Sequence, residues 1–175
     1  MKNKIRELLL QYDSILITAH KNPDGDAVGA GLALTLSLLE LGKKVRFVLQ
    51  DKIPDTTLFL EGSHLIEQYQ EEENFQNIEL VVFLDCATRD RAGCMNHLTE
   101  GKTTINIDHH MSNPHYGDYA FVEPNISATS EILTQLLREW NFPMNVAIAS
   151  ALYLGIVNDT GNFEHNNVTV NTLKA

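Results

Sequence analysis

Short apolar runs alternate along this chain with longer segments whose apolar residues recur at helical spacing. Ser14–Ala19, Leu80–Leu84 and Thr103–Ile107 are rich in β-favouring residues, and polar residues follow each of them at once. This pattern predicts buried strands, and Val45–Leu49 is a further strand candidate. Helices are predicted where Ile5, Leu8, Leu9 and Tyr12 open the chain, and over Ala27–Leu41, Ser127–Glu139 and Val146–Val157.

Strands that alternate with helical segments predict βαβ units. We therefore expect an α/β fold with a mostly parallel sheet of about five strands and helices on both faces. The carboxyl ends of parallel strands meet at one edge, where open α/β sheets bind ligands. Residues 20–26, Asp85 and residues 108–110 each follow a predicted strand, so we expect them to meet there.

Acidic residues and histidines dominate these strand ends. His20, Asp24, Asp26, Asp85, Asp108, His109 and His110 belong to this set, and Asp159 follows later in the segment NDTGNF. Carboxylates this close together repel one another unless cations neutralise them. Mixed imidazole and carboxylate ligands suit Mn²⁺, Fe²⁺, Zn²⁺ or Co²⁺ better than Ca²⁺.

Each of these residues also has an ordinary structural interpretation. The segment HKNPDGD could be a polar turn in which Asp26 caps the following helix. Asp85 and Asp159 could be turn residues, and His109 and His110 could lie on the surface. We favour metal binding because these acidic residues and histidines all occur in one chain and most of them follow predicted strands.

The charge of the chain limits its ligands. The formal net charge is -10, so a phosphate-bearing ligand needs a local positive centre, which bound metal ions would supply. The basic residues are scattered, with a short cluster only at Lys43, Lys44 and Arg46. Long duplex nucleic acid is therefore not expected as a partner.

Cys86 and Cys94 form neither a disulfide framework nor a zinc-ribbon pattern, which favours reduced thiols and a cytoplasmic protein. No stretch approaches the ~20 apolar residues of a membrane span, so no membrane partner is expected. The oligomeric state stays open, with a homodimer as one option. Cys86 is interpreted as a packing residue on the opposite side of its strand from Asp85.

Four motifs in order resemble those of the DHH phosphoesterase superfamily, from about His20 to Phe163. The first is HKNPDGDAVGAG, the second is Asp85 at the end of LVVFLD, the third is the DHH triplet at 108–110, and the fourth is NDTGNF. The resemblance implies a hydrolase that uses two divalent ions, with Mn²⁺ favoured and Mg²⁺, Co²⁺ or Fe²⁺ as alternatives.

The same resemblance implies a role for each site residue. One ion would be bound by His20, Asp24 and Asp85, and the other by Asp26, Asp85, His109 and Asp159, so that Asp85 bridges both. His110 would point at the substrate phosphate as a catalytic residue. We expect Asp108 to fix the ring orientation of its neighbour His109.

The start of the chain and the segment ATSEIL look most like the bacterial nanoRNase and 3'-phosphoadenosine 5'-phosphate (pAp) phosphatase group. The expected substrate is therefore a small nucleotide or a short oligonucleotide. Cyclic-dinucleotide phosphodiesterases, RecJ-type exonucleases and manganese pyrophosphatases share the metal motifs and remain alternatives. A non-enzymatic metal- or nucleotide-sensing module is the alternative from another class.

Members of that group continue into a smaller C-terminal DHHA1 domain with a glycine-rich motif, which is not found in this sequence. We therefore expect residues 1–175 to be the DHH catalytic domain, as a fragment of a longer protein. Gly25 and Gly29 are interpreted as residues that let the backbone turn tightly into the helix. The motifs assign no role to Arg89, Arg91, His64, His97, His115 and His165.

Overall fold

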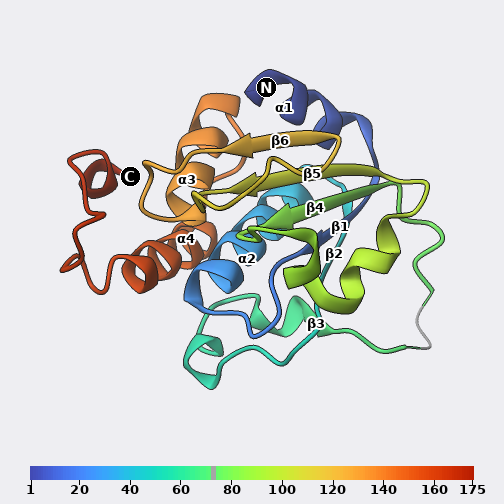
Figure 1. Cartoon of the computed structure of the whole chain (residues 1–175), viewed down its shortest axis with the longest axis horizontal. Helices are drawn as coiled ribbons and strands as arrows, with labels where there is room; N and C mark the ends of the chain where they lie inside the picture. Colours follow the sequence, from blue (N-terminus) through green and yellow to red (C-terminus); the bar gives the residue numbers. More distant parts are fainter. Residues whose placement is uncertain (72–73) are drawn as a thin grey trace.

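The computed structural model describes residues 1–71 and 74–175 and places six parallel strands in one sheet, in the order β3-β2-β1-β4-β5-β6. Figure 1 shows this order from β3 at the bottom to β6 at the top. The strands are β1 (Ser14–Thr18), β2 (Lys44–Leu49), β3 (Ile66–Gln68), β4 (Leu80–Leu84), β5 (Thr103–Asp108) and β6 (Tyr119–Val122).

The α/β class and the parallel sheet predicted from the sequence are confirmed, but the sheet has more strands than expected. The additional strands β3 and β6 lie at its two edges. They are three and four residues long and only partly buried, apart from one exposed position in β3. Such short segments carry too little hydrophobic pattern to be recognised in the sequence.

In the part of the chain that the structure describes, four α-helices accompany the sheet. They are α1 (Lys2–Gln11), α2 (Gly25–Glu40), α3 (Thr129–Trp140) and α4 (Val146–Asp159). Short 3-10 turns lie at η1 (Asp55–Thr57), η2 (Ser63–Leu65), η3 (Arg89–Thr99) and η4 (Thr172–Lys174). Within the described residues, no helix is long and apolar enough to cross a membrane.

The sheet separates two apolar clusters. Ile15 and Ile17 of β1 pack with residues of all four α-helices in the larger cluster. Leu16, on the opposite face, packs in a smaller cluster with Cys86 and with Met95 of η3. This alternation follows from the two-residue period of a strand. Helical segments therefore cover both faces, with the α-helices on one and the 3-10 turns of η3 on the other.

Helices α2 and α4 lie very close together because glycines line their contact. A Cβ atom added at Gly29 would lie 2.3 Å from the carbonyl oxygen of Ala151, and one added at Gly25 would lie 2.7 Å from the side chain of Asn158. Both glycines are inside α2 and neither has a positive φ. Their role is close helix packing, so the interpretation of a tight turn was wrong.

Candidate metal centre

The loop after β1 carries the first group of site residues. His20 is almost fully buried, and Asp24 caps α2 by accepting hydrogen bonds from the backbone N–H groups of Asp26 and Ala27, both at 3.0 Å. Asn22 in this loop has φ +54, and its N–H donates to Asp51 at 2.8 Å. These contacts hold the loop against its neighbours and turn it into α2.

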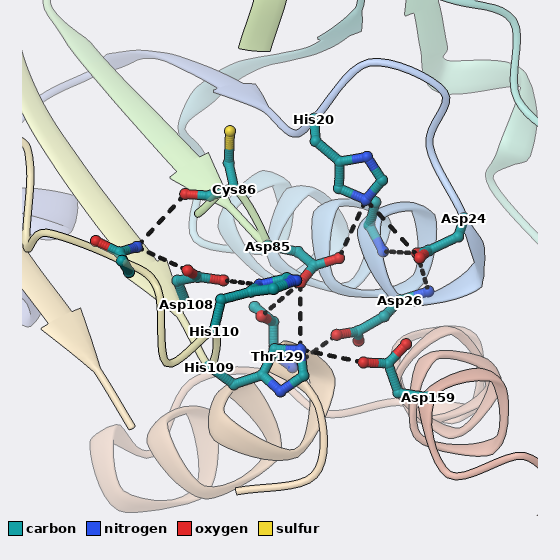
Figure 2. Close-up of polar contacts among 12 residues, drawn as sticks. His20, Asp24, Asp26, Asp85, Cys86, Asp108, His109, His110, Thr129 and Asp159 are labelled. Atoms are coloured by element: carbon teal, nitrogen blue, oxygen red, sulfur yellow. Dashed lines mark hydrogen bonds and ion pairs between the residues drawn. The ribbon is translucent and has the colours of Figure 1, made fainter. Parts of the chain in front are cut away.

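Asp85 lies at the centre of the site, directly after β4. It is 2% exposed and has φ +50, a left-handed conformation that aspartate adopts more readily than most residues. Its backbone N–H still continues the sheet by donating to the carbonyl oxygen of Ile107 at 3.1 Å. The strand end and the unusual φ together project the carboxylate beyond the sheet edge (Figure 2).

The two carboxylate oxygens of Asp85 face different groups of residues. Oδ2 lies 3.4 Å from Nε2 of His20, which is in turn 3.8 Å from Oδ2 of Asp24. Oδ1 lies 3.5 Å from Nε2 of His109, which is 3.1 Å from Oδ2 of Asp159. Asp85 thus stands between two sets of potential ligand atoms, as a bridging ligand would.

The ligand atoms of each set lie within 4.8 Å of one another. One set is His20, Asp24 and Asp85; another is Asp26, His109 and Asp159; a third combines Asp85 with His109 and His110. The structure thus brings together all six residues that the sequence predicted as metal ligands. They come from the β1 and β4 strand ends, the start of α2, the DHH segment and the last residue of α4.

The tautomers of His20 and His109 fit metal binding. Nδ1 of His20 donates to the carbonyl oxygen of Lys21 at 2.9 Å, and Nδ1 of His109 donates to that of Ile126 at 3.3 Å. A carbonyl oxygen only accepts, so in each neutral ring the proton is on Nδ1 and the lone pair of Nε2 faces the carboxylates. Nε2 of His109 is buried without a hydrogen-bond partner, as expected for an atom that binds a metal ion.

The pKa shifts show how the cluster behaves without cations. Burial raises the pKa of Asp26 well above its usual value, and the charges of Asp85 and Asp159 act in the same direction. Burial alone would lower the pKa of His109, but contacts with Asp159 and Asp85 outweigh it and raise the pKa to about 11. The cluster therefore retains protons that partly offset its carboxylates, and divalent ions would replace those protons.

His110 is oriented by the first residue of the DHH triplet. Its Nδ1 lies 2.8 Å from Oδ1 of Asp108, which is fully buried, whereas its own side chain is 31% exposed. The expectation that Asp108 orients His109 was wrong, because the carbonyl oxygen of Ile126 bonds that ring. Asp108 is the last residue of β5, and His110 follows it two positions later in the chain.

Thr129, at the start of α3, is a site residue that the sequence analysis missed. Its hydroxyl donates to Oδ1 of Asp85 at 3.2 Å, and its backbone N–H donates to Oδ2 of Asp26 at 2.6 Å. Oδ1 of Asp26 accepts from the N–H of Ser130 at 2.9 Å. Asp26 therefore caps a helix, as the structural interpretation of HKNPDGD allowed, but the helix is α3 rather than the one that follows it in sequence.

Other residues considered in the sequence contribute to packing. Cys86 is fully buried in the smaller cluster, as predicted, and burial raises the pKa of its thiol to about 11. Arg89 contacts the hydroxyl of Thr99 at 3.5 Å and lies over the ring of Tyr116. His165 contacts the carbonyl oxygen of Asp159 at 3.2 Å through Nδ1.

Comparison with known proteins places this site in a family. The family described as "DHH family, N-terminal domain" matches residues 14–156, which include the whole candidate metal centre. The chain belongs to the DHH family.

Curated proteins and a solved structure resemble the chain over most of its length. It is 34% identical over 161 residues to the bifunctional oligoribonuclease and PAP phosphatase NrnA of Thermus thermophilus, covering 91% of this chain and 47% of that protein. The protein of the same name from Bacillus subtilis is 29% identical over 183 residues, with 99% and 55% covered. An exopolyphosphatase-related protein from Bacteroides fragilis superposes with a TM-score of 0.90 at 25% identity, with 99% and 56% covered. The chain thus spans about half the length of these relatives.

Proposed function

We propose that residues 1–175 form the catalytic part of a metal-dependent phosphoesterase that hydrolyses short oligonucleotides, pAp, or both. The observation that carries this proposal is the position of Asp85, whose two oxygens face two separate sets of ligand atoms. Such an arrangement suits a pair of divalent ions that share one carboxylate. Two-metal sites of this kind are common in enzymes that cleave phosphate esters.

The residues that would bind the ions are those predicted from the sequence. His20 and Asp24 would bind one ion, Asp26, His109 and Asp159 would bind the other, and Asp85 would bind both. Mn²⁺ is favoured because the site mixes imidazole nitrogens with carboxylate oxygens. When bound, the ions would supply an activated hydroxide and neutralise the charge of the phosphoryl oxygens.

His110 would act on the substrate itself. Its hydrogen bond to Asp108 uses Nδ1, so the partly exposed ring offers Nε2 to a ligand. In its protonated form, the ring donates from Nε2 to a phosphoryl oxygen or gives a proton to the leaving-group oxygen. The buried Asp108 carboxylate would hold the ring in the orientation that presents Nε2.

The substrate class rests on the relatives, whose names describe oligoribonuclease and PAP phosphatase activity. Since the chain spans about half of their length, we propose that it is the DHH domain of a longer protein. Contacts to the base and ribose would then come from the remaining part. The unpaired Cys86 and Cys94 are consistent with a cytoplasmic enzyme.

The decisive experiment offers the full-length protein, loaded with Mn²⁺, four substrates side by side: pAp, the dinucleotide pApA, cyclic di-AMP and pyrophosphate. We expect the largest kcat/KM on pAp or pApA. Preference for cyclic di-AMP or pyrophosphate would refute the substrate class but keep the metal chemistry. Metal binding without hydrolysis of any of the four would favour the sensing module.

A second comparison tests whether contacts to the base and ribose come from outside residues 1–175. Residues 1–175 alone should fold and bind Mn²⁺ but hydrolyse nucleotides poorly, because binding energy from remote substrate groups aligns the reacting phosphate. The fragment and the full-length protein should be compared on pAp at equal metal occupancy. Equal kcat/KM would mean that the substrate pocket lies within residues 1–175.

A further inference from the structure

The orientation of His110 depends on a carboxylate that is itself buried. Asp108 is 0% exposed, and its Oδ1 contacts Nδ1 of His110 at 2.8 Å. A carboxylate with no access to water needs donors on its other oxygen, because an unsatisfied buried oxygen is unfavourable. Whatever holds that second oxygen therefore also determines where the imidazole of His110 points.

The second oxygen of Asp108 is held by Asn113. Nδ2 of Asn113 donates to Oδ2 of Asp108 at 2.7 Å and to Oδ1 of Asn106 at 2.7 Å. Asn106 is fully buried on β5, and its own Nδ2 lies 3.3 Å from the carbonyl oxygen of Cys86. The amide of Asn113 is thus fixed between the carboxylate of Asp108 and the buried amide of Asn106, which contacts the segment directly after β4.

The local backbone determines which way this amide faces. The N–H of Asn113 donates to the carbonyl oxygen of His110 at 3.1 Å, which closes a turn after the DHH triplet. Oδ1 of Asn113 accepts from the backbone N–H of His115 at 2.8 Å, and His115 has φ +59. Because Oδ1 of Asn113 accepts from a backbone N–H group, its NH₂ group must face Asp108. The amide therefore has a single orientation in which it donates to the carboxylate.

We infer that Asn113 is a positioning residue for His110 that acts through Asp108. Loss of its amide leaves Oδ2 of Asp108 without that donor in a buried site, so the carboxylate turns and the imidazole loses its fixed orientation. The effect on turnover rests on the catalytic role proposed for His110. The effect on ring orientation does not depend on that role.

The kinetic test is a double-mutant cycle in the Mn²⁺-loaded full-length protein. Asn113→Ala should lower kcat by about 10- to 100-fold, the usual effect of removing a partner that orients an active-site group, with metal stoichiometry retained. In a His110→Ala background the same change should cause no further loss. Independent, multiplying losses would overturn the inference, because they would show that Asn113 does not act through His110.

Tyr116→Phe is the matched control. It removes the hydroxyl that donates to the carbonyl oxygen of Cys86 at 2.8 Å, a partly buried hydrogen bond beside the same residues that does not involve Asp108. We expect kcat close to that of the wild type. An equal loss in Tyr116→Phe and Asn113→Ala would indicate general loosening of the cluster and overturn the inference.

A measurement without metal separates positioning from catalysis. In the metal-free protein, NMR should show a hydrogen-bonded Nδ1–H resonance of His110, assigned by its absence in His110→Ala. This resonance should shift or disappear in Asn113→Ala, or in Asn113→Leu if the alanine variant does not fold. An unchanged resonance would overturn the inference, whereas a changed resonance with unchanged kcat would support it and refute the catalytic role of His110.

Discussion

The replacement Gly29→Ala tests whether the close packing of α2 against α4 supports the metal centre. The added Cβ would lie 2.3 Å from the carbonyl oxygen of Ala151, whereas ordinary contacts begin at 3.4 Å. Because that oxygen belongs to backbone, the helices must separate by about 1 Å. The start of α2 carries Asp26 and the end of α4 carries Asp159, so the shift exceeds the tolerance of about 0.2 Å in metal–ligand distances.

The expected loss of stability is smaller than the clash suggests. Overpacking of a core costs about 1–3 kcal/mol, and the better helix propensity of alanine offsets about 1 kcal/mol of it. A net loss of up to about 2 kcal/mol lowers the Tm of a chain this long by up to about 8 °C. Metal affinity should therefore decrease more clearly than thermal stability.

The assay compares Gly29→Ala with Ser150→Ala, which places alanine on an exposed position of α4. Circular dichroism in chelator gives the Tm of the metal-free protein, and titration calorimetry gives the affinity and stoichiometry for Mn²⁺. We expect Ser150→Ala to match the wild type in both. If Gly29→Ala melted at the wild-type temperature and bound Mn²⁺ normally, the packing argument would be refuted.

Three further predictions concern the site itself. In Asp85→Asn, asparagine still tolerates φ +50, and metal analysis should show the loss of both ions. His110→Ala should keep both ions, and its kcat should fall by about 10²- to 10³-fold. The reverse pattern would contradict the assigned roles. Chelation should abolish activity, and Mn²⁺ affinity measured by calorimetry should rise with pH through neutrality by about tenfold per unit for each proton released. The sign follows because contacts with carboxylates raise the pKa of His20 above its usual value and raise the pKa of His109 to about 11, so metal binding must displace protons; an affinity independent of pH would exclude this. Thr129→Val should weaken Mn²⁺ binding by about 10- to 100-fold because the hydroxyl bond to Asp85 is lost, while Thr129→Ser should retain it; equal affinities would show that this bond is unimportant.

The sequence predicted well where local pattern alone decides the outcome. The continuous apolar run before Asp85 and the β-favouring run before Asp108 are readable as buried strands, and the carboxyl ends of parallel strands meet at one edge of the sheet. The residues expected to bind metal therefore lie together in the structure. Their coordination of two ions stays a prediction until metal is measured.

Contacts between distant segments could not be predicted in the same way. Thr129 reaches Asp85 and Asp26 only because α3 begins beside α2, and no local pattern encodes that approach. Asn113 resembles an ordinary turn residue, and its second role depends on the burial of Asp108 beside β4. Gly29 was misinterpreted for the same reason, because the sequence of a helix does not show which distant segment packs against its glycine.

The distribution of the site along the chain has a consequence for synthesis. His20 is near the start and Asp159 ends the last α-helix, so a growing polypeptide can form β1, β4 and β5 before the metal centre is complete. The second set of ligand atoms forms only when α4 docks against α2. If the centre binds metal as proposed, metal loading would be a late event that follows the docking of α4, because an incomplete chain lacks Asp159 of the second set of ligand atoms.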